Sequence, residues 1–222
     1  MLIGLHGKMQ SGKDTCGQFL IERLGFKRLA FADALKQALY SLNPYVALSG
    51  HGIPPNHMNT PYMIRLQEIV DDIGWERAKT EVPETRTLLQ RLGTEAGRDI
   101  HGYDCWTNIV KRQIEQEPAQ NFVITDLRFP NEKAFVEQMG GYVVHIIRDG
   151  QRSDDTHASE QVLEGIPYKI MNNGSLGDLQ TGIYTMYRYL TIERETEAPM
   201  TVNCYIPCIQ KEVEPLDTAA SV

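Results

Sequence analysis

The residues with the clearest chemical potential form a glycine-containing loop near the start of the chain. Residues 7–15 read G-K-M-Q-S-G-K-D-T and follow the apolar run L-I-G-L. They fit the phosphate-binding loop pattern G-x-x-x-x-G-K-[ST] at every fixed position except the last. In such a loop, backbone N–H groups and the next helix's N-terminus bind phosphates, and the lysine reaches the β- and γ-phosphates. The pattern predicts a nucleoside triphosphate site made by Lys8, Ser11, Gly12, Lys13, Asp14 and Thr15.

Asp14 stands where this pattern normally has the hydroxyl that holds Mg²⁺. Two arrangements stay open from the sequence: Asp14 binds the ion through water, or Thr15 supplies the hydroxyl. A further carboxylate, Asp126, ends the apolar run 122–125. At the carboxyl end of a strand it would face the phosphate loop and either hold Mg²⁺ or act on an acceptor phosphate. The alternative is a turn or helix-capping role for Asp126.

Several cations could form a second phosphate site. Arg128 follows Asp126 by two residues and has the planar, bidentate geometry that suits a phosphate clamp. Lys36 falls in the first turn of a helix for which Asp33 is a suitable N-cap. A cation at a helix N-terminus adds to the partial positive charge there, so Lys36 indicates an anion site. The alternative is a solvated surface lysine.

Arg91 and Arg98 are seven residues apart, so in an α-helix they share one face. Gly93 and Gly97 lie within the same segment, each at a cost of about 1 kcal/mol relative to alanine. Such glycines indicate close approach by another backbone or a ligand. The alternative is a solvated face on which Glu95 pairs with either arginine.

Further candidates occur later in the chain. Trp106 could stack on a base, but it also begins an apolar helical face, and both roles stay open. Arg148, Arg152 and His157 flank a polar segment after an apolar run, and loop arginines can close over phosphates during transfer. The alternative is a polar surface loop. The run N-N-G-S at 172–175 ends a predicted strand, where a nucleotide base would lie, and Ser175 with Asp178 predicts a helix start.

The spacing of apolar residues supplies the elements that position these groups. It predicts strands at residues 2–6, 28–31, 122–125, 142–147 and 168–171, with helical patterns between them. This alternation predicts a parallel sheet with helices on both faces. Residues 44–83 interrupt it, with a helical pattern only at 64–73, as do residues 149–166. The tail from 193 holds one strand-like run at 202–206.

Composition bounds the function. The chain has 222 residues, 41% hydrophobic, 23% charged, with a formal net charge of −7. This balance disfavours duplex nucleic acid as a partner but allows a phosphorylated small substrate. The four cysteines lack zinc-site spacing and are expected to be reduced. No run approaches the ~18 apolar residues of a membrane span, and no basic region precedes the first apolar stretch, so we expect a cytoplasmic protein.

Taken together, these motifs resemble the deoxynucleoside monophosphate kinases of bacteriophages over residues 1 to about 190. The S-G-K-D end of the loop also occurs in phosphomevalonate kinases, but the block at 88–98 together with Trp106 favours the nucleotide kinases. The matching segments are residues 7–15, F-A-D-A-L-K at 31–36, L-L-Q-R-L-G-T-E-A-G-R at 88–98, Trp106, I-T-D-L-R-F-P-N-E at 124–132 and H-A-S-E at 157–160.

The resemblance implies an α/β, three-layer P-loop kinase fold over 1–190, with an inserted acceptor-binding region at 44–120 and a lid at 148–166. The role of 191–222 is not implied. The implied reaction is Mg²⁺-dependent transfer from ATP to a deoxynucleoside 5′-monophosphate, for DNA precursor supply. Lys13, Asp126, Arg128, Arg148 and Arg152 would act in transfer, and Asn173 and Gly174 would join the loop at ATP. The implied acceptor ligands are Asp33, Lys36, Arg65, Arg91, Arg98, Trp106, Asp126, Arg128 and Glu132, and the implied metal ligands are Asp14, Thr15 and Asp126.

No membrane or nucleic-acid partner is implied, and the location would be the host cytoplasm if the chain is viral. A homodimer stays open because relatives in the superfamily often pair. A kinase for a non-nucleotide phosphate, of the phosphomevalonate or dephospho-coenzyme A type, is the alternative enzyme. A nucleotide-dependent switch is disfavoured by the lack of an N-K-x-D element. Base preference is not given by the sequence.

Overall fold

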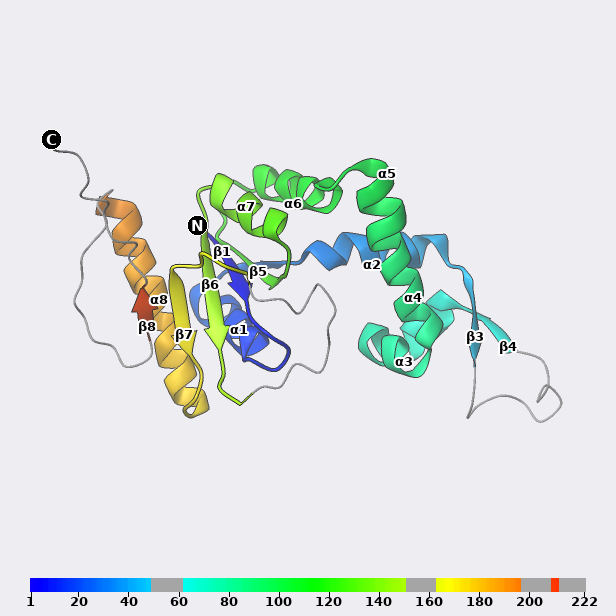
Figure 1. Cartoon of the computed structure of the whole chain (residues 1–222), viewed down its shortest axis with the longest axis horizontal. Helices are drawn as coiled ribbons and strands as arrows, with labels where there is room; N and C mark the ends of the chain where they lie inside the picture. The colour runs from blue at the N-terminus through cyan, green and yellow to red at the C-terminus, as the bar shows by residue number, and fades with distance from the viewer. Residues whose placement is uncertain (49–61, 151–162, 197–208, 212–222) are drawn as a thin grey trace, which may run out of the picture. The chain divides into compact units, whose positions relative to one another are not determined.

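The computed structural model describes residues 1–48, 62–150, 163–196 and 209–211. The chain forms two compact units (Figure 1). The first comprises Met1–Ala30 and Ile114–Val222, and the second comprises Phe31–Gln113. The chain therefore leaves the first unit after Ala30 and returns at Ile114. The sequence predicted an inserted region at 44–120. The second unit of the structure begins earlier, at Phe31, and ends at Gln113.

A six-stranded sheet is the centre of the first unit. Its order is β2-β5-β1-β6-β7-β8; the first five strands are parallel, and β8 pairs antiparallel with β7. The expected parallel sheet is confirmed, although β2 ends before residue 31 and β5 extends past residue 125. The strands are β1 (Leu2–His6), β2 (Lys27–Leu29), β5 (Phe122–Leu127), β6 (Tyr142–Ile147), β7 (Tyr168–Met171) and β8 (Ile209–Lys211).

Helices cover both faces of this sheet, as the three-layer prediction requires. On one face, Ile3 and Leu5 of β1 pack in a core with Leu20 of α1 (Lys13–Leu24) and Met186 of α8 (Leu176–Thr196). On the other face lies α7 (Pro130–Gln138), which contacts β1 and β6. Gly4 allows this approach, because a Cβ there would lie 3.3 Å from a Val136 methyl of α7.

Specific hydrogen bonds start the last helix of the first unit and attach it to the sheet. Ser175 and Asp178 start α8 as predicted: Ser175 N donates to Asp178 Oδ2 (2.7 Å), and Asp178 N donates to Ser175 Oγ (3.2 Å). The helix runs beyond residue 190 to Thr196, and the Tyr168 hydroxyl of β7 donates to Glu193 (2.7 Å). The strand expected at 202–206 lies outside the described residues.

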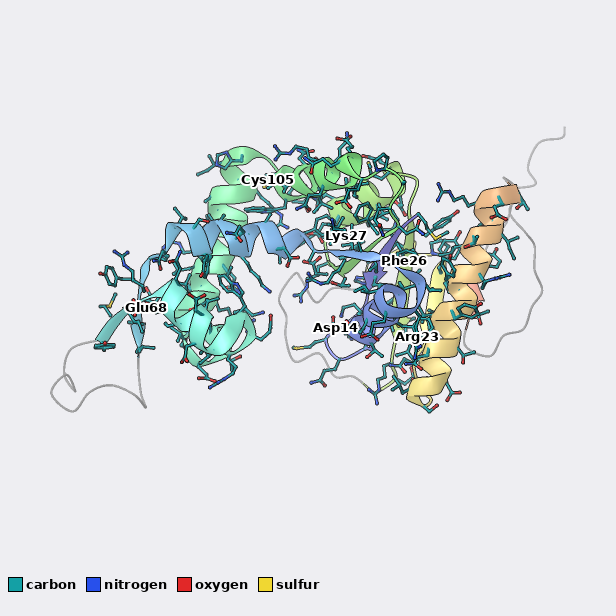
Figure 2. All side chains as sticks on the ribbon, turned by 180° about the vertical axis from the view of Figure 1, so that it is seen from behind. Asp14, Arg23, Phe26, Lys27, Glu68 and Cys105 are labelled. Atoms are coloured by element: carbon teal, nitrogen blue, oxygen red, sulfur yellow. The ribbon has the colours of Figure 1, made fainter. Side chains whose placement is uncertain are left out.

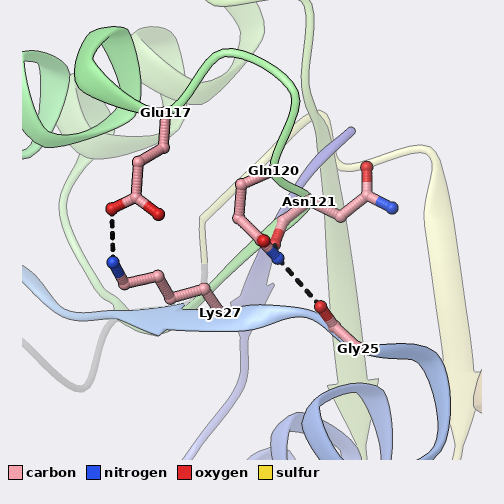
Figure 3. A network of polar contacts seen from close by, with 5 residues as sticks. All are labelled: Gly25, Lys27, Glu117, Gln120 and Asn121. Carbon is pink, nitrogen blue, oxygen red and sulfur yellow. Dashed lines mark hydrogen bonds and ion pairs between the residues drawn. The ribbon is translucent and has the colours of Figure 1, made fainter.

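Polar contacts join the turn before β5 to the start of β2 (Figure 3). Gln120 Nε2 donates to the Gly25 carbonyl at 2.8 Å, and Lys27 forms an ion pair with Glu117. They lie at the point where β2 and β5 begin to pair in parallel, with Lys27 opposite Phe122. They therefore fix the point at which two strands distant in sequence enter the sheet.

The second unit is mostly helical. Its core is formed by apolar residues such as Leu39, Val46, Leu66 and Leu89. Within 44–83, where the sequence indicated only one short helix, the structure has an antiparallel strand pair and the longer helix at 66–81, and a further helix begins at Pro83. The elements are α2 (Phe31–Leu42), β3 (Tyr45–Leu48), β4 (Tyr62–Arg65), α3 (Leu66–Glu81), α4 (Pro83–Arg91), the π-helix η2 (Leu92–Arg98), α5 (Asp99–His101) and α6 (Cys105–Gln116), whose last turn enters the first unit.

Two local predictions in this unit are wrong. The helix α2 begins at Phe31, so Asp33 lies in its first turn and is not its N-cap. The expected α-helix through residues 88–98 becomes a π-helix from Leu92, with i→i+5 hydrogen bonding. Across the described parts of both units, no helix combines the length and apolar character needed to cross a membrane.

Candidate active site

The phosphate-binding loop connects β1 to α1 and requires glycine at both fixed positions. Gly7 has φ 150° and Gly12 has φ 103°. A Cβ at Gly7 would lie 2.4 Å from the Ile146 carbonyl oxygen, and one at Gly12 would lie 2.6 Å from Asn172 Nδ2. Neither position has room for a side chain. The loop therefore has the tight backbone path that the motif predicts.

Lys13 folds back over this loop. Its ammonium donates to the carbonyl oxygens of Gly7 (2.5 Å) and Lys8 (2.7 Å). The same lysine lines a cavity of about 310 Å³, which opens at the N-terminal end of α1. The cavity also includes Gln10, Gly12, Asp14, Thr15, Arg148, Asn172, Gly174, Leu176 and Leu179. Helix dipole, backbone N–H groups and two cations make this an anion site.

Asn172, which the sequence analysis placed in the run near a base but not among the ATP ligands, supports the loop. Its side-chain Nδ2 donates to the Ser11 carbonyl at 2.8 Å, and its backbone N donates to the Ile147 carbonyl at 2.6 Å. Asn173 instead exchanges hydrogen bonds with Asp149 (2.6 and 2.9 Å), while Gly174 lines the cavity. The sequence signal for this role is an asparagine at the carboxyl end of a predicted strand, at the start of the run expected near a base.

Ser11 contributes to the loop through its backbone. Its hydroxyl is buried and has no hydrogen-bond partner among the described residues. The Oγ atom lies beneath Gly7, 2.7 Å from where a Cβ on that glycine would be. The Ser11 hydroxyl therefore packs under the loop, and a contact of Ser11 with ATP stays a prediction.

Two of the three metal candidates line the cavity of the first unit. Asp14 is exposed at the start of α1 (Figure 2), Thr15 is half-buried, and both line the cavity. Asp126 is the second-last residue of β5, next to Leu127, which pairs with His6 just before the loop. Within the described ranges, no three His, Cys, Asp or Glu side chains form a metal cluster. Mg²⁺ commonly uses one or two carboxylates with phosphates and water, so this sparse donor set fits Mg²⁺ bound together with a nucleotide.

Glu132 has a structural role at the start of α7. It is 3% exposed, and its Oε2 accepts hydrogen bonds from the backbone N atoms of Arg128 (2.8 Å) and Phe129 (3.0 Å). The carboxylate thereby fixes the backbone from which the exposed Arg128 side chain extends. A direct contact of Glu132 with substrate stays a prediction.

In the second unit, Asp33 and Lys36 line a cavity of about 360 Å³ together with Gln37, Tyr40 and Trp75. The Lys36 ammonium lies 3.4 Å from Glu76. The structure thus brings these two predicted residues together.

Three predicted arginines make contacts of their own in the second unit. Arg65 donates to the Asn43 carbonyl (2.9 Å), and its guanidinium lies 3.8 Å from the centre of the Tyr45 ring. Arg91 pairs with Glu95 at 3.1 Å, as in the alternative given for it, and Arg98 donates to the Gly93 carbonyl at 3.3 Å. Because η2 is π-helical, the shared face expected from 3.6 residues per turn does not apply to Arg91 and Arg98. None of the three lines either cavity described above.

Trp106 packs on the π-helix. Its indole Nε1 donates to the Gly93 carbonyl at 2.9 Å, and a Cβ on Gly97 would lie 2.7 Å from the indole Cζ2. The close approach predicted from the glycines is thus made by a tryptophan side chain. Of the two roles left open for Trp106, packing is the one observed, and base contact stays a prediction.

Arg148 follows β6 and is exposed at the cavity of the first unit, consistent with a cation that can reach phosphates there. Arg152, His157 and Glu160 lie outside the described residues. A parallel sheet with helices on both faces, and a G-x-x-x-x-G-K loop between its central strand and the next helix, define a P-loop nucleotide-binding protein.

Comparison with known proteins narrows this class. A model of the deoxynucleotide monophosphate kinase family matches residues 62–183. A putative deoxynucleotide monophosphate kinase of Acanthamoeba polyphaga mimivirus is 34% identical over 180 residues, covering 75% of this chain and 83% of that protein. The deoxynucleotide monophosphate kinase of Enterobacteria phage T4 is 24% identical over 244 residues, covering 85% of this chain and 99% of that protein. The chain belongs to the deoxynucleotide monophosphate kinase family.

Among solved structures, a dephospho-CoA kinase from Campylobacter jejuni aligns with a TM-score of 0.45 and 14% identity, covering 87% of this chain and 98% of that one.

Proposed function

We propose that this protein transfers the γ-phosphoryl group of ATP to a deoxynucleoside 5′-monophosphate, giving the deoxynucleoside diphosphate and ADP. An oxygen of the acceptor phosphate forms the new bond to the γ-phosphorus, and the bond from that phosphorus to the β,γ-bridging oxygen breaks. Family membership and the cavity lined by Lys13 at the phosphate loop carry this proposal. No protein nucleophile is required, because the acceptor phosphate is already an anion near neutral pH.

The first unit would bind ATP. Backbone N–H groups of the loop would bind the α- and β-phosphates, and Lys13 would exchange its two carbonyl contacts for β- and γ-phosphate oxygens. Arg148 would add positive charge where negative charge develops during transfer, and Arg152 would join it. Gly174 and the neighbouring Asn173 would border the adenosine.

Mg²⁺, when bound, would neutralise charge on the β- and γ-phosphates. Either Asp14 through water or Thr15 through its hydroxyl would hold it, and Asp126 would be a further ligand. Asp126 lies at the carboxyl end of β5 and Arg128 follows the strand directly, and we propose that both act on the transferred group.

Cations of each unit are proposed to contribute to binding of the acceptor. In the second unit Lys36 lines a cavity, and in the first unit the backbone N of Arg128 donates to Glu132. The other residues proposed to contribute on the acceptor side are Asp33, Arg65, Arg91, Arg98 and Trp106. Since the relatives above belong to viruses, we further propose that the protein acts in the host cytoplasm to supply DNA precursors.

The direct test is turnover of each of the four common deoxynucleoside monophosphates with Mg·ATP, following the diphosphate by chromatography. Lys13→Ala should lower kcat/KM by about 10²–10³-fold or more, because it removes a charge that stabilises the transition state. Lys133→Ala is the matched control, because Lys133 pairs with Glu137 on α7. Absence of turnover with every monophosphate, or an unaffected Lys13→Ala enzyme, would refute the proposal.

A further inference from the structure

The cavity of the second unit is lined by side chains that include neither the phosphate loop nor the arginines proposed for the acceptor. It is lined by Asp33, Lys36, Gln37 and Tyr40 of α2 and by Trp75 of α3. The four α2 residues follow the spacing i, i+3, i+4 and i+7, so they form one helix face. Its volume of about 360 Å³ is in the range of small-molecule sites. An aromatic ring, an amide, a hydroxyl and charges of both signs therefore meet at one cavity.

A break in α3 determines where Trp75 lies. Gly74 has φ 75° and ψ 164°, a conformation outside the helical region and essentially restricted to glycine. Trp75 follows directly, packs on the unit's core and lines the cavity. Glycine adopts this conformation without steric cost, so the chain can turn here and direct Trp75 to the cavity.

Contacts to α2 hold α3 on both sides of this break. Before it, the Tyr40 hydroxyl donates to Asp71 at 2.7 Å. After it, Glu76 binds Lys79 at 2.6 Å and approaches Lys36 at 3.4 Å. Glu76 thus makes its shorter ion pair with Lys79, which leaves Lys36 the longer contact. Trp75 is held between these two attachments as a preorganised platform.

Gln37 is the residue in the cavity best suited to reading a base. Its amide can donate and accept hydrogen bonds, and its Nε2 donates to Ser41 Oγ, one turn away, at 3.3 Å. An amide of this kind can pair with a base edge, while an aromatic side chain stacks on the base face. Lys36, on the adjacent position of the same helix, is placed for an anionic group.

The geometry points to Trp75 and Gln37 as the residues that bind and select the base of the acceptor deoxynucleotide, with Trp75 stacking on it and Gln37 reading its edge. This assignment rests on the proposed function. It adds the specificity-determining residues, neither of which the motifs of the sequence single out.

Gln37→Glu tests the edge contact by removing the amide's donor. A carboxylate can accept from the donors that every base carries, but it cannot donate to a base acceptor as the amide can. The kcat/KM ratio between the monophosphate that the wild type prefers and each of the others should therefore change by about 5–100-fold. Gln113→Glu, the same change at an exposed position of α6, should leave this ratio at its wild-type value. A Gln37→Glu ratio equal to that of wild type would overturn the assignment of Gln37.

Trp75→Leu and Trp75→Phe test stacking. Leucine should raise KM for all monophosphates by about 10-fold or more with a smaller effect on kcat, and phenylalanine should restore most of the loss. Trp75 and Trp106 are the two tryptophans of the chain, so monophosphate binding should quench fluorescence in wild type through both rings and less in Trp75→Phe, where only the contribution of Trp106 remains. Fluorescence quenching measures binding of the monophosphate and does not depend on turnover. Equal quenching in both proteins would overturn the role of Trp75, whereas absent turnover with normal quenching would refute the kinase proposal only.

Discussion

A single buried asparagine connects two loops that carry the nucleotide site. Asn172 is 9% exposed, and its amide donates to the Ser11 carbonyl, 161 residues away in the sequence. It also occupies the space that a side chain on Gly12 would need. The phosphate loop therefore depends on the loop after β7 for its shape, in addition to its own glycines.

Replacing this residue should damage both stability and nucleotide binding. Asn172→Ala leaves the buried Ser11 carbonyl without its donor, so the free energy of unfolding should fall by about 1–3 kcal/mol, and the KM for ATP should rise several-fold. Urea unfolding and initial rates measure the two effects. Asn108→Ala, at an exposed position of α6, should change stability by less than about 0.5 kcal/mol. A wild-type KM for ATP in a destabilised Asn172→Ala protein would contradict the positioning role.

Backbone conformation set by a local motif could be predicted, and contacts made by distant partners could not. The spacing of Gly7, Gly12 and Lys13 predicted the tight backbone path of the loop, whereas its support by Asn172 comes from a residue far away in the sequence. The capping of α7 by Glu132 was missed because the resemblance implied a role for this acid as an acceptor ligand. Its burial, which decides between the two roles, appears only in the fold.

At the scale of elements, the π-helix is the feature that local sequence patterns did not predict. The apolar spacing of residues 88–96 suits an α-helix, but the segment from Leu92 is wound as a π-helix under the indole of Trp106. The spacing of apolar residues reports on one segment alone. The π-helix also packs against a tryptophan of α6, which this spacing does not include. The same limit applies to β3 and β4, whose pairing joins residues on either side of 49–61.

The two glycines of η2 should therefore respond differently to alanine. A Cβ at Gly97 would lie 2.7 Å from the Trp106 ring and 2.9 Å from the Leu92 carbonyl oxygen, so Gly97→Ala should destabilise by about 1–3 kcal/mol. At Gly93 the nearest atom is a Leu35 methyl at 3.2 Å, and the gain in helix propensity is about 1 kcal/mol, so Gly93→Ala should be neutral or stabilising. Thermal unfolding of both variants measures the difference. Equal melting temperatures would contradict this packing.

At the scale of the whole molecule, the order of the sheet brings together groups that sequence spacing keeps apart. The alternation of strands and helices predicted a parallel sheet, but the order β2-β5-β1-β6-β7 and the division at Ala30 and Ile114 arise from long-range packing. One consequence is that β1 and β6 pair His6 with His145, with ring centroids 4.8 Å apart and both side chains buried. Two neighbouring histidines in a core make stability depend on pH.

Burial, followed by the nearby charges of His6, Lys169, Lys13 and Lys8, lowers the pKa of His145 from 6.5 to about 4. An unfolded chain protonates this histidine near pH 6.5, and the folded chain only near pH 4. Between these values the unfolded state binds more protons, so the free energy of unfolding should decrease as the pH falls. The loss should be roughly 2 kcal/mol by pH 4.5. Urea titrations at pH 7.5, 6.0 and 4.5 should show a shallower decrease for His145→Leu than for wild type. His101→Gln removes an exposed histidine and should keep the wild-type slope; if His145→Leu kept it as well, the buried pair would not be the origin of the acid sensitivity.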